Sequence, residues 1–342
     1  MPHLAIIADD LTGALDSSAP FSGSGKVVVA TDANAIEKAL QEQPDVIAVS
    51  TRSREIAVAE ARDRVAQVLR QLPAETRLFK KIDSRLKGNI AAELEAFGPR
   101  HMLVAPAIPD FGRVVRGGRL SGFGIESPIN VARVLGRAAD MAVIPEVTSA
   151  EDMHEALRDL ASDTILVGAR GLAMALSGMA QARDVVFDRL AGPICFAVGS
   201  TDPITLAQVA RLRQVRGDIQ VIKAPGGQVP EISGPPAEVT LLQITPGEDT
   251  SARRAAQRFA EGAAPVLRLA QTVLMTGGAT AEAMLDEQGI DVLTVTGEVL
   301  PGLPCCRVGE RSFLTKSGGF GDAETFVRLA EMAKHMEGCG ND

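Results

Sequence analysis

Three pairs of charged residues in the first quarter of the chain each follow an apolar run, and their types are those that bind small polar ligands. The pairs are Asp9 with Asp10, Arg52 with Arg54, and Lys81 with Asp83. Carboxylates accept hydrogen bonds from hydroxyl groups or take up a proton, whereas lysine and arginine bind carboxylates. Together the three pairs suit a small acid that carries several hydroxyl groups.

The first and third pairs also have a purely structural interpretation. Asp10 or Thr12 would cap the helix after the first apolar run, and Ser84 or Asn89 would cap the helix after a solvated basic turn. Strand alternation, however, places Lys81 and Asp83 on one face and Lys80 on the other. Because clusters of solvent-facing charge seldom sit on an apolar strand, we favour a ligand site.

Three glycine-rich turns in the second half of the chain, at 199–202, 276–280 and 316–322, each precede a predicted helix. Glycine lets backbone N–H groups approach a phosphate closely, and a helix N-terminus adds a favourable potential. One such turn is common in proteins. Three in one domain, one of them with Lys316, predict a cradle for nucleotide phosphates.

These side chains must be positioned by strands and helices that alternate along the chain. The expected strands are 4–8, 26–30, 45–50, 77–82, 101–105, 141–145, 164–168, 193–198, 219–223, 239–244, 272–276, 291–296 and 304–308. The expected helices include 55–71, 149–161, 203–215, 249–262, 278–288 and 323–337. Near-continuous Val, Ile and Leu in the strands predict an α/β fold.

A chain of 342 residues exceeds what one hydrophobic core usually organises. We predict two domains, 1–182 and 193–338, each a mostly parallel sheet flanked by helices, with the active site in the cleft between them. The glycine-rich and arginine-rich stretch at 109–128 is expected to be a mobile loop. Two helix starts are clearly marked, by Asp202 before Pro203 and by a capping box from Ser149 to Asp152.

The composition disfavours several classes of protein. Hydrophobic residues make up 46% of the chain, as in globular proteins and unlike disordered ones. A net charge of −8 and the absence of Trp and Tyr argue against nucleic-acid binding. No apolar run is long enough for a membrane span, and the N-terminal run is too short for a signal peptide, so we expect a cytoplasmic protein. The cysteine and histidine spacings match no zinc site.

As an ordered set the motifs resemble the four-carbon acid sugar kinase family, formerly classed as a domain of unknown function. The motifs are 8–14, 80–84 with 88–89, 199–200, 277–280 and 316–321, and they extend over nearly the whole chain. The resemblance implies an N-terminal acid-sugar-binding domain and a C-terminal nucleotide-binding domain. It also implies ATP-dependent phosphorylation of the terminal hydroxyl of an acid such as D-threonate, D-erythronate, L-threonate or 3-oxo-tetronate.

The resemblance further implies which residues form the site. The substrate contacts would be Asp10, Arg54, Lys81, Ile82, Asp83 and Ser84. The ATP contacts would be Ser200, Gly277, Gly278, Ala279, Thr280 and a glycine of the pair Gly318 and Gly319, with Lys316 added from its glycine turn. The candidates for a catalytic base are Asp10, Asp83 and Asp322, and the sequence does not choose among them. Mg²⁺ is expected with ATP, and no residue is identified as its ligand.

The sequence departs from the family pattern at two places in the substrate half. Arg85 stands where the family usually has threonine after the serine of the second motif. The family's Gly-Arg pair is present as Gly112 and Arg113, but residues 114–118 lack the usual threonine-containing pattern. The sequence therefore predicts the reaction without predicting the acid or its stereochemistry.

Two other functions are compatible with a two-domain α/β chain. A nicotinamide-dependent oxidoreductase is disfavoured because only Gly13 is present where the dinucleotide fingerprint requires three glycines. A non-catalytic sensor that binds sugar acid and nucleotide is the stronger alternative, but its phosphate cradle would serve no reaction. The expected partners are a small-molecule sugar acid and ATP, and neither nucleic acid nor membrane. Self-association into a homo-oligomer is left open.

Overall fold

The computed structural model describes residues 1–179, 187–232, 234, 237–248 and 251–333. Its internal contacts divide the chain into two compact units, Met1–Asp184 and Val185–Asp342. The expected domain limit at residue 182, the end of the last expected helix and Cys339 lie outside the described residues. Among the helices described, none is both long and apolar enough to cross a bilayer.

The first unit has ten strands and seven α-helices among its described residues. Its elements are β1 (Leu4–Ala8), α1 (Leu11–Ser18), β2 (Val27–Ala30), α2 (Ile36–Gln41), β3 (Val46–Ser50), α3 (Val58–Gln71), β4 (Arg77–Lys81), α4 (Ile90–Glu95), β5 (Met102–Ala105), β6 (Arg113–Arg116), β7 (Arg119–Gly122), β8 (Ile129–Asn130), α5 (Val131–Leu135), β9 (Ala142–Val143), α6 (Ala150–Ala156), β10 (Ile165–Gly168) and α7 (Arg170–Met179). Short 3₁₀ turns are η1 (Ala19–Phe21), η2 (Ala33–Ala35), η3 (Pro109–Phe111) and η4 (Gly136–Met141).

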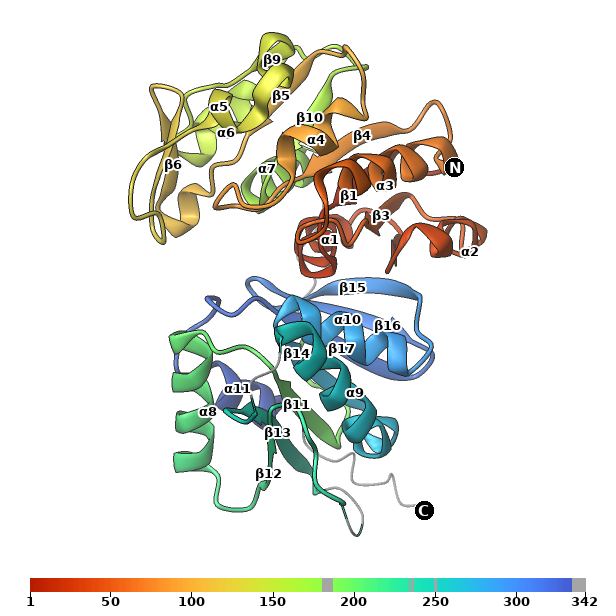
Figure 1. Cartoon of the computed structure of the whole chain (residues 1–342), viewed down its shortest axis with the longest axis vertical. Coiled ribbons are helices and arrows are strands. Elements are labelled where there is room, and N and C mark those ends of the chain that lie inside the picture. The colour runs from red at the N-terminus through yellow and green to blue at the C-terminus, as the bar shows by residue number, and fades with distance from the viewer. Residues whose placement is uncertain (180–186, 233, 235–236, 249–250, 334–342) are drawn as a thin grey trace. The chain divides into compact units, whose positions relative to one another are not determined.

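The main sheet of this unit is parallel throughout, in the order β2-β3-β1-β4-β10-β5-β9. All five residues of β1 and of β3 are buried, because helices cover both faces of a parallel sheet. Helix α1 packs beside α7, and α3 packs beside α4. Right-handed crossovers place these two pairs on opposite faces of the sheet (Figure 1).

The chain leaves β1 in one direction and leaves the neighbouring strand β4 in the other. Helix α1 leads from β1 across β3 to β2, whereas α4 leads from β4 towards β5. The strand order therefore reverses between the carboxyl ends of β1 and β4, and such a point is where open α/β sheets bind ligands.

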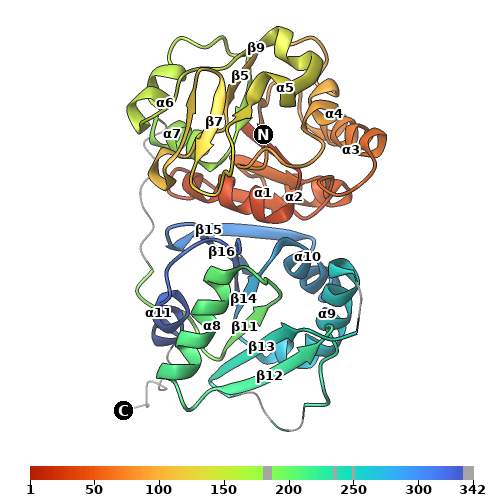
Figure 2. The ribbon, with the colours of Figure 1, turned by 60° about the vertical axis from the view of Figure 1, so that its left-hand side comes forward.

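The second unit repeats this architecture with an antiparallel edge. Its elements are β11 (Ile194–Val198), α8 (Pro203–Val215), β12 (Gln220–Pro225), β13 (Val239–Thr245), α9 (Ala252–Leu269), β14 (Thr272–Thr276), α10 (Gly278–Glu287), β15 (Val292–Leu300), β16 (Leu303–Val308), β17 (Arg311–Lys316) and α11 (Thr325–Met332). The strand order is β12-β13-β11-β14-β17-β16-β15, parallel as far as β17 and antiparallel beyond it. Helices α8 and α11 pack together, as do α9 and α10, on opposite faces of the sheet (Figure 2).

The expected α/β fold with mostly parallel sheets is confirmed, as are both marked helix starts. Asp202 caps α8 by accepting a hydrogen bond from Ile204 N, and Ser149 and Asp152 form a reciprocal capping box on α6. Every expected strand is present, although β9 is only two residues long and β15 extends to Leu300.

The secondary structure differs from the sequence analysis at two places. Strand β17 is missing from the expected strands, because four of its six residues are polar, yet it lies in the sheet between β14 and β16. The stretch at 109–128 is no mobile loop, because β6 and β7 lie in it and pair in a small antiparallel sheet with β8.

Candidate active site

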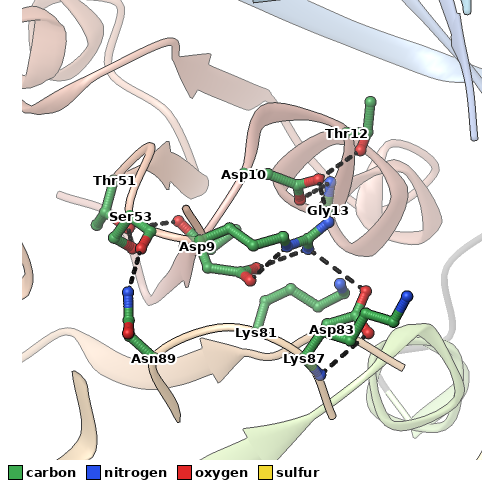
Figure 3. Close-up of polar contacts among 12 residues, drawn as sticks. Asp9, Asp10, Thr12, Gly13, Thr51, Ser53, Lys81, Asp83, Lys87 and Asn89 are labelled. Atoms are coloured by element: carbon green, nitrogen blue, oxygen red, sulfur yellow. Dashed lines mark hydrogen bonds and ion pairs between the residues drawn. The ribbon is translucent and has the colours of Figure 1, made fainter. Parts of the chain in front are cut away.

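The first three charged pairs meet at one edge of the sheet, as the sequence predicts. Ala8 pairs with Ser50 on β3 and with Lys81 on β4, so the residues that follow each strand emerge side by side. Figure 3 shows Asp9, Asp10, Lys81 and Asp83 gathered at this edge. Arg52 is the exception, because its Nε donates to Thr31 O 3.0 Å away, towards β2.

Arg54 is held by three carboxylates. Its Nε and Nη2 donate to the two oxygens of Asp9 at 2.7 and 3.0 Å, and its Nη1 lies 2.7 Å from Asp10 Oδ2. Its Nη2 also faces Asp83 Oδ2 at 3.6 Å. Burial lowers the pKa of Arg54, but the Asp10 and Asp9 carboxylates outweigh it and raise that pKa overall. Because these aspartates occupy the guanidinium, the geometry favours Arg54 as the residue that positions them.

Asp10 is largely engaged within its own turn. Its Oδ1 accepts from Gly13 N at 2.8 Å and caps α1, and its Oδ2 accepts from Thr12 Oγ1 at 2.8 Å. A Cβ at Gly13 would lie 2.6 Å from Asp10 Oδ1 and 2.9 Å from Lys81 Nζ. Glycine is therefore required there to let the lysine ammonium approach the turn.

Lys81 and Asp83 retain capacity for a ligand. The Lys81 side chain is buried, and its ammonium has no hydrogen bond or ion pair within the described residues. In Figure 3 it points towards the space between Gly13 and Asp83. Asp83 Oδ1 accepts from the N–H groups of Arg85 and Lys87 at 2.9 and 3.3 Å, whereas Oδ2 accepts no hydrogen bond from the described residues and faces Arg54 Nη2 at 3.6 Å. An ammonium and a carboxylate oxygen are thus both available at this edge.

A buried network beneath the site includes Glu93, a residue that the sequence analysis missed. Lys80 points to the opposite face from Lys81 and forms an ion pair with Glu93 of α4 at 2.9 Å, with both side chains fully buried. Glu93 also accepts a hydrogen bond from Ser53 Oγ, which lies 2.5 Å from Thr51 Oγ1. The network ties the loop after β3 to β4 and α4, and so fixes the loop that carries Arg54.

Two further residues, Ile82 and Ser84, were predicted to contact the substrate. Ile82 is fully buried in the core and its N–H donates to Gly168 O at 2.9 Å, so its side chain is not directed at a ligand. Ser84 is partly exposed and accepts a hydrogen bond from Arg113 Nη1 at 2.7 Å. Arg113, which belongs to the family-like Gly-Arg pair, is therefore brought to the site by the small sheet.

The three glycine turns of the second unit also lie side by side. Gly199 N donates to Thr276 O at 3.2 Å, and Gly277 N donates to Lys316 O at 3.3 Å. The turns follow β11, β14 and β17, which are neighbours in the sheet. Between β11 and β14 the strand order reverses, because α8 and α10 leave them towards opposite faces, and open α/β sheets bind ligands at such a point.

Close packing at these turns explains their glycines. A Cβ at Gly318 would lie 2.5 Å from Ser200 Oγ and 2.7 Å from Asp202 Cβ. Gly277 has a φ of 90°, a conformation that side chains other than glycine rarely adopt. Thr280 is buried against Gly199, whereas Ala279 is exposed and Gly278 and Gly319 are partly exposed.

Lys316 has its three N–H donors engaged within the protein. They bond to Thr205 Oγ1, Ser317 O and Gly318 O at 2.9, 3.0 and 2.9 Å. Burial lowers the pKa of Lys316 to about 8, opposed by Asp202. The geometry favours a lysine that shapes the third turn over one that contacts phosphate directly.

Asp322 is exposed and paired. Its Oδ1 accepts from Arg328 Nη2 at 2.8 Å and from Glu324 N at 3.1 Å. Burial raises the pKa of Asp322, but Arg328 and these hydrogen bonds together outweigh it and lower that pKa below its usual value. Within the described chain, no cluster of three or more His, Cys, Asp or Glu side chains is arranged to hold a metal ion.

The fold is that of a two-unit α/β protein in which charged side chains gather where the strand order reverses in one unit and glycine turns gather where it reverses in the other. Residues 4–129 match the family of sugar-binding N-terminal domains, and residues 230–326 match that of nucleotide-binding C-terminal domains. The chain belongs to the four-carbon acid sugar kinase family.

Curated relatives match nearly the whole chain. A D-threonate kinase of Cupriavidus necator is 30% identical over 92% of this chain and 94% of its own length. A D-threonate kinase of Bordetella bronchiseptica is 28% identical over 96% of this chain and 97% of its own length. A 3-oxo-tetronate kinase of Methylobacterium radiotolerans is also 28% identical, over 96% of this chain and 99% of its own length.

A solved structure supports the fold. A protein of Salmonella typhimurium LT2 superimposes with a TM-score of 0.75 at 19% identity, covering 97% of this chain and 99% of its own. At this identity the likeness supports the fold alone.

Proposed function

We propose that this protein transfers the γ-phosphoryl group of ATP to the terminal hydroxyl of a four-carbon sugar acid. The observation that carries the proposal is the position of Lys81 beside Asp83 at the strand ends of the first unit, where an ammonium and a carboxylate oxygen face the same space. Relatives named as kinases of D-threonate and 3-oxo-tetronate support the substrate class.

Asp83 is the best placed of the three base candidates. Asp10 has both oxygens engaged, by Gly13 N, Thr12 Oγ1 and Arg54. Asp322 is exposed and held by Arg328. Asp83 Oδ2 can accept a hydrogen bond from the substrate hydroxyl and take its proton as the hydroxyl oxygen attacks the γ-phosphorus. The backbone donors on Oδ1 hold the carboxylate in orientation.

Lys81 serves the same reaction by attracting the acid. The protein carries a net charge of −8, so an anionic substrate needs a local cation to overcome the background potential. Lys81 can also donate to substrate oxygens, because its N–H groups have no acceptor in the described structure. Arg54 supports the site indirectly, by holding Asp9, Asp10 and Asp83.

In the second unit, α10 is the helix best suited to bind phosphate. Helix α8 already has the Asp202 carboxylate on its N-terminus, whereas α10 begins at Gly278 after Gly277, and no side chain of the described residues caps it. The first backbone N–H groups of α10 can therefore donate to phosphate oxygens, helped by the helix dipole. ATP supplies the phosphoryl group, and Mg²⁺ bound to it neutralises phosphate charge. A cytoplasmic location and self-association stay predictions.

The decisive experiment is a screen of purified protein for ATP consumption against D- and L-threonate, D-erythronate and the 2- and 3-oxo acids. We expect Mg²⁺-dependent formation of ADP and a terminal phosphate ester with at least one acid. In parallel, ATP at a hundredfold excess over its Kd should stabilise the protein by about 2.7 kcal/mol in a thermal-shift assay. Binding of acid and ATP without turnover would favour a sensor, and binding of neither would contradict the proposal.

We expect Gly318→Ala to raise the KM for ATP by about tenfold, corresponding to about 1.4 kcal/mol. The added methyl group would push the third turn away from Ser200 and Asp202. The KM for the acid should stay unchanged, since the substitution lies in the other unit. Gly217→Ala is the matched control, because its Cβ would meet no atom within 4 Å. Equal rises in both KM values would instead indicate misfolding.

A further inference from the structure

An arginine pair lies beside the proposed substrate site. Arg113 is only 6% exposed, and its Nε and Nη1 donate to Phe123 O and Ser84 Oγ at 3.1 and 2.7 Å. Neither Arg113 nor the exposed Arg85 forms an ion pair within 4 Å among the described residues. A buried guanidinium without a carboxylate partner is unusual, because burial of a charge costs free energy unless the charge is paired.

The two guanidinium groups converge on one point. The Cβ position of Gly124 lies 3.5 Å from both Arg113 Nη2 and Arg85 Nε. Burial and the nearby Arg85 charge both lower the pKa of Arg113, and the Asp83 carboxylate only partly offsets them. Two like charges held close together repel each other, and an anion between them would relieve that repulsion.

The pair is continuous with the proposed reaction site. Asp83 Oδ1 accepts from Arg85 N, and Ser84 Oγ accepts from Arg113. Arg113 Nη2 has no acceptor in the described structure, and neither has the Arg85 side chain. These donors therefore point to an anionic ligand group next to Asp83.

We infer that Arg113 and Arg85 form the subsite that binds the carboxylate of the sugar acid. This inference rests on the proposed kinase function and adds the group that selects acids over uncharged polyols. Guanidinium groups suit a carboxylate because they donate two parallel hydrogen bonds. Lys81 then still supplies local positive charge and donates to the hydroxyl groups, and Arg85 becomes a specificity determinant.

Arg85→Ala tests the inference, because an exposed side chain can be removed without disturbing the core. We expect kcat/KM for the best acid to fall by about tenfold to hundredfold, the range for loss of a charge-assisted contact. The KM for ATP should not change. Arg85→Lys should recover part of the loss. Arg116→Ala is the control, because it removes the same charge from the small sheet that carries Arg113.

A second measurement isolates the carboxylate. The amide of the same acid has the same hydroxyl groups without the negative charge, so the wild-type preference for acid over amide should shrink in Arg85→Ala. Equal losses for acid and amide, a rise in the KM for ATP, or an effect no larger than that of Arg116→Ala would each overturn the inference.

Calorimetric titration of the acid without ATP separates this inference from the kinase proposal. Acid binding that weakens in Arg85→Ala supports the subsite even if no phosphorylation occurs. Turnover by the wild type with unaltered acid binding in the variant would leave the kinase proposal intact and overturn the subsite. Absence of acid binding by the wild type would overturn both.

Discussion

Asp83→Asn is expected to lower kcat by about 10²–10⁴ while the KM for the acid changes little. Asparagine keeps an oxygen for the N–H groups of Arg85 and Lys87, so the turn should retain its shape. Its amide cannot take a proton from the substrate hydroxyl at neutral pH. Steady-state kinetics with both substrates will show whether the loss falls on kcat, as removal of a base requires.

Asp322→Asn is the matched comparison in the other unit. It makes the same chemical change at an exposed carboxylate paired with Arg328. We expect less than a twofold change in kcat, which corresponds to less than roughly 0.4 kcal/mol in activation free energy. A large loss of kcat in Asp322→Asn together with a small one in Asp83→Asn would move the base to the nucleotide-binding unit.

Lys80→Met is expected to destabilise the first unit by about 3–5 kcal/mol. The substitution leaves the fully buried Glu93 carboxylate without its cation, at a position that also accepts a hydrogen bond from Ser53. Urea unfolding followed by far-UV circular dichroism will measure the change, since the chain contains no Trp or Tyr for intrinsic fluorescence.

The double variant with Lys80→Met and Glu93→Leu provides the control. Replacing both members of a buried ion pair by apolar side chains removes the unpaired charge, so most of the lost stability should return. If Lys80→Met alone lowers the free energy of unfolding by less than about 1 kcal/mol, the prediction is wrong, because an unpaired buried carboxylate should cost more than a surface ion pair.

Much of the architecture could be predicted from the sequence because it is encoded locally. Continuous apolar runs such as Leu4–Ala8 are typical of buried parallel strands, and β1 has this role. The caps at Asp202 and Ser149 depend on residues two or three positions away. The convergence of Asp10 and Asp83 follows from a general property of parallel sheets, whose strand ends meet at one edge.

Strand β17 and the small sheet could not be recognised in this way. The polar residues Thr315 and Lys316 are buried in β17, and Lys316 is satisfied by Thr205, which lies 111 positions earlier. In β6 and β7 only alternate residues such as Val115 and Leu120 are buried, between arginines and glycines that are typical of loops. Local periodicity carries no signal when the compensating partner is distant.

The sequence by itself determined which residues stand at the strand ends, and hence that carboxylates and cations gather there. Only the tertiary structure decided how they pair. It shows Arg54 occupied by aspartates, Lys316 occupied by its own turn, and Arg113 placed 29 positions away against Ser84. The physical reason is that residue type sets the charge of a side chain, whereas its free capacity for a ligand depends on every donor and acceptor that folding brings within hydrogen-bonding distance.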